Sequence, residues 1–179
     1  MTKAKIIAQV IAREAGFSDR KDDAGGKTKY GITEKVARKW GYEGQMHDLP
    51  YDTAMKIYED LYWPKALDDI LALSVPIAAE LFDTGVNMGV GTAGKFLQRS
   101  LNVLNKLETL FDDVKVDGIV GPATVKALEA YLDKRRGRGE TALLTALNCL
   151  QGARYVELTE RRKSDEANLF GWLCHRIQL

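Results

Sequence analysis

The chain has 179 residues, of which 45% are hydrophobic and 28% charged, enough for one sizeable domain or two small ones. Its net charge of +1 excludes a protein that binds polyanions over its whole surface. The charge is uneven, because residues 1–90 hold 12 Lys and Arg against 14 Asp and Glu, whereas residues 91–179 hold 14 against 11. The second half is therefore the better partner for an acidic polymer.

The two cysteines, Cys149 and Cys174, are too few for a disulfide framework. Their spacing from His47 and His175 does not match a metal site, so we expect two buried thiols.

No stretch reaches the roughly 18–20 apolar residues of a membrane span. The apolar run near the N-terminus is interrupted by Gln9 and Arg13, unlike that of a signal peptide. We therefore expect a chain that is made in the cytoplasm without a signal peptide.

In the first half, the apolar spacing predicts a helix over residues 2–14 with a buried face formed by Ile6, Ile7, Val10 and Ile11. Residues 16–30 are rich in Gly, Asp and Lys, which predicts a loop or a small β-hairpin. Further helices are expected near residues 33–40 and 52–62, the latter stopped by Pro64.

Residues 75–88 are apolar nearly all round, which predicts a buried central helix followed by another helix after Gly89. Asp117 and Gly118 indicate a turn, and Pro122 suits the first position of a helix. The polar run 134–140 predicts a break before a long helix over residues 141–162. We expect a domain boundary near residue 90, giving domains 1–90 and 91–179.

Glu14 is the first candidate catalytic residue. It lies three and seven residues after Ile11 and Ile7, on the helix face that points to the core. Partial desolvation there would raise the pKa of its carboxyl group, and glycosidic-bond cleavage needs a carboxylic acid that still carries its proton. The alternative is an ordinary helix-terminal Glu paired with Arg13 or a nearby Lys.

The loop that follows offers possible second carboxylates, and Gly25 and Gly26 permit a tight chain reversal. Thr28 and Tyr30 supply hydroxyl groups beyond it. The acidic residues are either a partner for the acid or solvated turn residues; they are Asp19, Asp22 and Asp23.

Two segments here resemble the motif of the glycoside hydrolase family 108 muramidases. These are EAGF at residues 14–17 and DAGGKTKYGIT at residues 23–33, and their spacing matches the family pattern without a gap. The family includes phage and prophage endolysins and muramidases of toxin-secretion systems. The departures from its pattern remove a Tyr hydroxyl and a glycine but no ionisable catalytic group; they are Ala15, Phe17 and Ala24.

The resemblance implies a mostly α, lysozyme-like α+β fold, in which a helical bundle has a small hairpin lobe after its first helix. It implies that Glu14 is the catalytic acid and that Asp23 and Thr28 position water, although Asp23 could instead cap the Gly25-Gly26 turn. Tyr30 is a candidate for substrate binding. Asp83 and Asn87 resemble a second family segment, and either bind the sugar acetamido groups or anchor neighbouring loops.

The second half resembles the helical peptidoglycan-binding domain often fused behind this hydrolase, through VDGIVGPAT at residues 116–124 and GWL at residues 171–173. The basic run, residues 134–138, suits wall carboxylates by charge, but a solvated loop is the better explanation. Without interleaved aromatic residues it does not resemble a nucleic-acid site.

The sequence thus predicts an endo-acting muramidase that hydrolyses the β-1,4 bond between N-acetylmuramic acid and N-acetylglucosamine of peptidoglycan. The resemblance implies no metal or organic cofactor, a monomer, passage through a holin-like membrane pore, and action in the periplasm or at the cell wall. The alternatives are a lytic transglycosylase and a non-catalytic peptidoglycan-binding protein.

Overall fold

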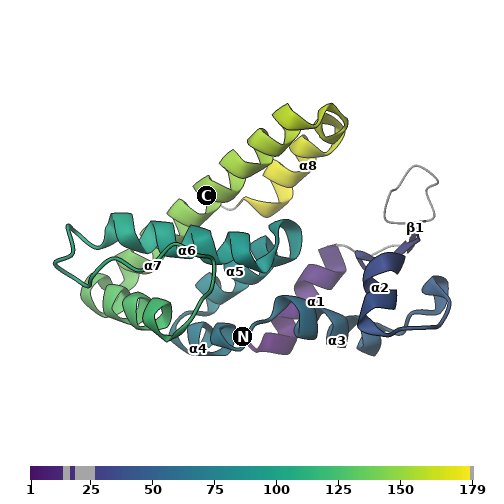
Figure 1. Ribbon diagram of the computed structural model, residues 1–179, viewed down its shortest axis with the longest axis horizontal. Helices are drawn as coiled ribbons and strands as arrows, with labels where there is room; N and C mark the ends of the chain where they lie inside the picture. Colours follow the sequence, from purple (N-terminus) through teal and green to yellow (C-terminus); the bar gives the residue numbers. More distant parts are fainter. Residues whose placement is uncertain (14–16, 19–26, 178–179) are drawn as a thin grey trace. The chain divides into compact units, whose positions relative to one another are not determined.

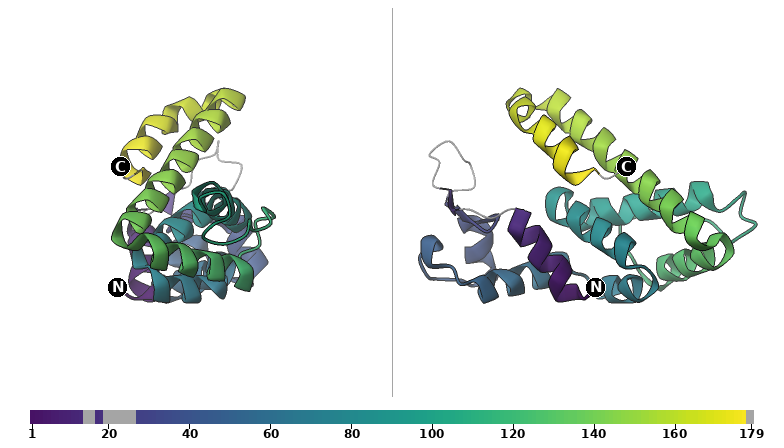
Figure 2. Two further views of the ribbon diagram at one scale, coloured as in Figure 1. Left: turned by 90° about the vertical axis from the view of Figure 1, so that its left-hand side faces the viewer. Right: turned by 180° about the vertical axis from the view of Figure 1, so that it is seen from behind.

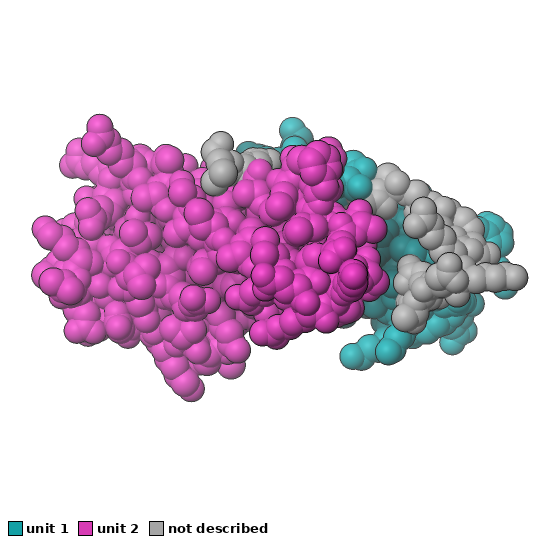
Figure 3. Space-filling model, turned by 90° about the horizontal axis from the view of Figure 1, so that it is seen from above, with its two compact units in different colours: residues 1–64 teal, residues 65–179 magenta. Residues whose placement is uncertain are grey.

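The computed structural model describes residues 1–13, 17–18 and 27–177 of the chain, and most of them are helical (Figure 1 and Figure 2). The mostly α fold with a small β lobe after the first helix is confirmed. The chain forms two compact units, Met1–Pro64 and Lys65–Leu179, which Figure 3 colours separately. Among the described residues, no helix is both long and apolar enough to cross a bilayer.

The first unit consists of α1 (Lys3–Arg13), a small sheet, α2 (Glu34–Trp40), the short 3-10 helix η1 (Met46–Asp48) and α3 (Tyr51–Tyr62). The apolar face predicted for the first helix is confirmed, because Ile6, Ile7, Val10 and Ile11 are all buried. This face packs in the first unit where α1 lies against α3, whose Ala54, Ile57 and Tyr58 are also buried. The helix that leads to Glu14 is therefore fixed along its length by the core.

The second unit contains α4 (Ala66–Leu73), α5 (Val75–Met88), α6 (Val90–Leu104), α7 (Pro122–Arg161), a 3-10 helix η2 (Lys163–Asp165) and α8 (Glu166–Arg176). Helix α5 has the bounds predicted from the sequence. The Ser74 hydroxyl caps it by accepting a hydrogen bond from the Ile77 amide at 3.2 Å. Helices α4, α6 and α7 all pack against α5, and its central position explains why it is apolar on nearly every face.

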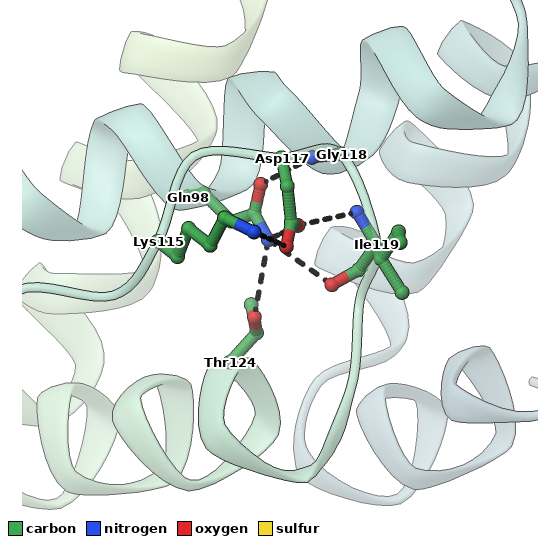
Figure 4. Close-up of polar contacts among 6 residues, drawn as sticks. All are labelled: Gln98, Lys115, Asp117, Gly118, Ile119 and Thr124. Atoms are coloured by element: carbon green, nitrogen blue, oxygen red, sulfur yellow. Dashed lines mark hydrogen bonds and ion pairs between the residues drawn. The ribbon is translucent and has the colours of Figure 1, made fainter.

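A long loop joins α6 to α7, and the side chain of Gln98 holds it to α6 (Figure 4). The buried Gln98 amide accepts a hydrogen bond from the Gly118 N–H at 2.8 Å and donates to Asp117 Oδ1 at 3.0 Å. It also lies within 3.1 Å of the Ile119 carbonyl and 3.4 Å of the Thr124 hydroxyl. The predicted turn at Asp117-Gly118 is confirmed, with Gly118 at a φ of 84°.

The predicted break in the run 134–140 is present as a kink. Only Arg136 leaves helical geometry (φ 54°, ψ −149°), and helix continues on both sides of it.

The expectation of buried thiols was wrong, because Cys149 and Cys174 are both exposed and free. Cys149 lies two positions from the buried Leu147 and two from the buried Gln151. Residues two apart on a helix do not share a face, so Cys149 points away from the core.

Candidate active site

The lobe that follows α1 is a three-stranded antiparallel sheet of β1 (Phe17–Ser18), β2 (Thr28–Lys29) and β3 (Ile32–Thr33), in the order β1-β2-β3. Tyr30 and Gly31 form the two-residue turn between β2 and β3, with φ values of 55° and 74°. Two positive φ values are the requirement of a type I′ turn, the connection that best fits twisted strands. The expected hairpin is therefore confirmed, and a third strand extends it.

Thr28, the candidate water-positioning residue, lies on the central strand of this sheet. Its backbone pairs with Ser18 of β1 and Thr33 of β3. Thr28 as a whole residue is partly exposed. Because strands on both sides hold it, the backbone at Thr28 is fixed in position.

Glu14 and Asp23, the candidate acid and its partner, lie outside the described residues. Glu14 comes directly after α1, which ends at Arg13, and β1 begins three residues later. Asp23 falls between β1 and β2, and the described ends of that segment meet at the Ser18–Thr28 pair. The described residues thus give the anchors on both sides of the two carboxylates, whose catalytic roles stay predictions.

Tyr30 is anchored to the helical part of the first unit. Its carbonyl accepts a hydrogen bond from the Tyr58 hydroxyl at 2.9 Å, and its ring meets the Tyr51 ring edge-on with centroids 5.7 Å apart. The Lys29 ammonium lies 5.2 Å from the centre of the Tyr30 ring and donates to the His47 carbonyl. These contacts fix the hairpin tip against α3 and η1.

Tyr58 was not among the residues predicted from the sequence, although it is the buried anchor of the hairpin. It lies 28 residues from Tyr30, so no local motif joins them. The available signal was a large aromatic residue with a hydroxyl group on the buried face of α3, because a buried hydroxyl needs a hydrogen-bond partner.

Asp83 and Asn87 both lie on α5 in the second unit. Asp83 is 5% exposed, and Oδ1 of its carboxylate lies 3.3 Å from the Arg176 guanidinium of α8. Gln151 of α7 contacts the other oxygen at 3.4 Å, and Asn87 donates to the Asp83 carbonyl at 2.8 Å. These contacts fit the anchoring role that the sequence left open, while binding of sugar groups stays a prediction.

Comparison with known families accounts for nearly the whole chain. Residues 7–89 match the family described as glycosyl hydrolase 108, and residues 92–177 match the family described as a predicted peptidoglycan domain. The first segment is a glycosyl hydrolase 108 domain. The chain is therefore a glycoside hydrolase joined to a peptidoglycan domain, and the pair supports the muramidase activity predicted from the sequence and implies action at the cell wall.

Among solved structures, the chain is similar to SagA of Brucella abortus, with 23% sequence identity and a TM-score of 0.62. The match covers 95% of this chain and 94% of that one, so the two share a fold from end to end. No curated protein matches the chain.

The hydrolase domain and the first compact unit have different limits. The two family matches meet between residues 89 and 92, whereas the compact units divide after Pro64. The reason is that α4 and α5, which belong to the hydrolase match, pack against α6 and α7. A functional boundary near residue 90 stays a prediction.

Proposed function

We propose that the chain is an endo-acting muramidase that hydrolyses the β-1,4 bond between N-acetylmuramic acid and N-acetylglucosamine. The observation that carries the proposal is the match of residues 7–89 to glycosyl hydrolase 108 together with the peptidoglycan domain behind it. The hydrolase domain alone does not identify which polysaccharide is cleaved. The second domain supports peptidoglycan as the substrate.

In the proposed reaction Glu14 donates its proton to the glycosidic oxygen as the bond to the sugar breaks. Asp23 takes a proton from water, whose oxygen forms the new bond to the anomeric carbon, and the Thr28 hydroxyl orients that water. Tyr30, and Asp83 with Asn87, are proposed to contact the substrate. Support comes from the buried face of α1, which fixes the helix before Glu14, and from the central position of Thr28 in the sheet.

Substitution of Glu14 tests the proposal. Glu14→Gln keeps the shape of the side chain but cannot act as an acid, so we expect reducing ends to be released from purified sacculi about 10²–10⁴ times more slowly. Glu34→Gln is the matched control, because Glu34 is the first residue of α2 and, among the described residues, its carboxylate pairs with Arg38 on its own helix at 2.8 Å. Equal rates for Glu14→Gln and the unmodified chain would refute the assignment.

The reaction products separate hydrolysis from the alternative lytic transglycosylase. Hydrolysis leaves a reducing muramic acid, whereas transglycosylation leaves a 1,6-anhydro ring because the C6 hydroxyl attacks in place of water. Mass spectrometry of the released fragments distinguishes them by the mass of one water. Anhydro products from the unmodified chain would replace the hydrolase by a transglycosylase.

We also propose that the chain acts as a monomer in the periplasm and reaches it through a holin-like pore, in phage lysis or toxin secretion. The support is the resemblance of the motif to that of endolysins and secretion-associated muramidases. Lysis of cells that produce the chain only when a holin is co-expressed is the expected result. Lysis without a holin would contradict the export route, and a dimer in gel filtration would contradict the monomer.

A further inference from the structure

A groove of about 370 Å³ lies within the peptidoglycan domain, between α6 and the part of α7 that follows the kink. Lys95, Phe96 and Arg99 line it from α6, and Leu150, Arg154 and Glu157 line it from α7. Lys95 and Phe96 are adjacent, and Arg99 lies one helical turn after them; on α7 the three residues are four, three and seven apart, so each set lines one side of its helix. The groove is thus formed by two helix faces that pack against each other in one unit.

The groove has an apolar floor and a charged rim. Phe96 is only 6% exposed and, with Leu150, forms the apolar part. Lys95 and Arg99 are exposed above it. Polysaccharide and peptide ligands combine apolar faces with polar groups, and pockets for them have this composition.

Within the part of the chain that the structure describes, neither Lys95 nor Arg99 of α6 forms an ion pair. Arg154 forms an ion pair with Glu157 at 2.9 Å, so the charges of these two side chains cancel. Lys95 and Arg99 make no hydrogen bond or ion pair with the rest of the described chain. Like charges four residues apart on a helix repel each other, so the pair destabilises α6 unless an anion binds there.

A second groove in the same domain shows that this imbalance is local. It lies between the loop that joins α6 to α7 and the first part of α7, and it has a volume of about 520 Å³. Two acidic side chains, Asp112 and Asp113, balance the basic Lys115 and Lys126 there. An anionic polymer is therefore attracted to the groove of Lys95 and Arg99 and not to this one.

We propose that the groove between α6 and α7 binds carboxylates of the peptide stems of peptidoglycan, through Lys95 and Arg99. The proposal rests on the wall-binding part of the proposed function. It specifies where the wall binds on the domain and which chemical group of the wall is bound. Arg and Lys form charge-assisted hydrogen bonds with carboxylates, and the apolar floor suits the methyl groups of alanine-rich peptides. Phosphate polymers of the cell wall are also negatively charged. The test therefore removes them, so that only binding to the carboxylates is measured.

The test measures cosedimentation of the full chain with sacculi that hydrofluoric acid has stripped of phosphate polymers. The Glu14→Gln background keeps the sacculi intact. We expect Lys95→Gln/Arg99→Gln to weaken binding about tenfold, corresponding to about 1.4 kcal/mol. The matched control is Lys134→Gln/Arg138→Gln, an exposed Lys and Arg at the same spacing, which should leave binding within about twofold.

A second arm amidates the peptide carboxylates with a carbodiimide and an amine. The parent chain should then bind as weakly as the Lys95→Gln/Arg99→Gln variant. The proposal is overturned if the variant binds like the parent, if the difference persists on amidated sacculi, or if it appears only when phosphate polymers are present. A larger loss in the control pair would place the site on the basic run, and circular dichroism confirms that each variant is folded.

Failure of this proposal is distinguishable from failure of the proposed function. If the unmodified chain releases reducing ends but Lys95 and Arg99 do not affect binding, only the groove is wrong. If groove-dependent binding is found without release of reducing ends, the muramidase is wrong and the groove stands. If the chain does not sediment with sacculi at all, both the groove and the wall-binding role are wrong.

Discussion

The side-chain amide oxygen of Gln98 accepts a hydrogen bond from the Gly118 N–H at 2.8 Å, although the two residues are 20 positions apart. A side chain thus takes the place that a backbone carbonyl has in a helix or a sheet. Asn102 of the same helix exchanges two hydrogen bonds with the Val114 backbone, at 2.8 and 2.9 Å. The two side chains together fix the loop of residues 105–121, in which the described structure has neither helix nor strand. The same loop approaches α6 backbone to backbone, because Gly94 and Gly118 leave no side-chain atoms between the two segments. The loop and α6 are thus held by several hydrogen bonds and by close packing.

The close approach predicts that Gly94→Ala destabilises the protein. A Cβ atom at Gly94 would lie 2.3 Å from the Gly118 carbonyl oxygen, a backbone atom that cannot rotate away. We expect a loss of about 1–3 kcal/mol in the free energy of unfolding, even though alanine favours helix by about 1 kcal/mol. Gly91→Ala on the same helix is the control, because its Cβ meets no atom within 4 Å. Urea denaturation measures both, and equal stabilities would contradict the packing argument.

Asp117 makes part of this stability depend on pH. The Ile119 N–H, followed by the Gln98 amide, donates to its carboxylate and lowers the pKa of Asp117 below its ordinary value. A lowered folded-state pKa contributes stability above the unfolded pKa of about 3.9, and this contribution is lost as the pH falls through the folded value. The unfolding free energy should therefore decline more steeply below about pH 4 in the parent than in Asp117→Asn. Asp112→Asn, an exposed residue of the same loop, controls for the lost surface charge; parallel curves for the parent and Asp117→Asn would refute the prediction.

The hairpin that carries Thr28 and Tyr30 should depend on Tyr58. Tyr58→Phe keeps the buried ring but removes the hydroxyl that donates to the Tyr30 carbonyl. We expect a loss of about 1 kcal/mol in unfolding free energy, the usual contribution of one hydrogen bond. If Tyr30 contacts substrate, the Michaelis constant on soluble glycan should also rise. The control is Tyr51→Phe, which retains the ring contact with Tyr30; a Tyr58 variant as stable as this control would contradict the anchoring role.

Local sequence signals predicted the elements that depend on local chemistry. The end of α5 follows from Gly89, and the start of α7 follows from Pro122. The composition of residues 16–30 predicted a loop or a small β-hairpin, and the structure has the hairpin. Each of these signals acts within a few residues, so it can be recognised from the sequence alone.

Contacts between distant residues were not predictable in this way. Gln98 and Gly118, Tyr30 and Tyr58, and Asp83 and Arg176 are 20, 28 and 93 residues apart. Their polar groups meet only after the helices have packed, and apolar periodicity reveals which faces are buried but not which polar groups are then paired. The exposed position of Cys149 has the same origin, because its residue type alone favours burial.

The ion pair between Asp83 and Arg176 separates anchoring from substrate binding. The Asp83 side chain is 6% exposed and the Arg176 side chain 11%, so Arg176→Met leaves a carboxylate without its cation in the core. Loss of one partner of a buried pair costs about 3 kcal/mol, and Asp83→Asn in the same chain should recover much of it, because the charge is then gone as well. Denaturation of both single variants and the double variant gives the coupling energy; simply additive losses would show that the pair does not act as a unit.

Hydrolysis by the double variant then decides between the two roles of Asp83. If the hydrolysis rate recovers together with the stability, Asp83 is an anchor. If the rate stays low although the double variant is stable, the Asp83 carboxylate contacts the substrate.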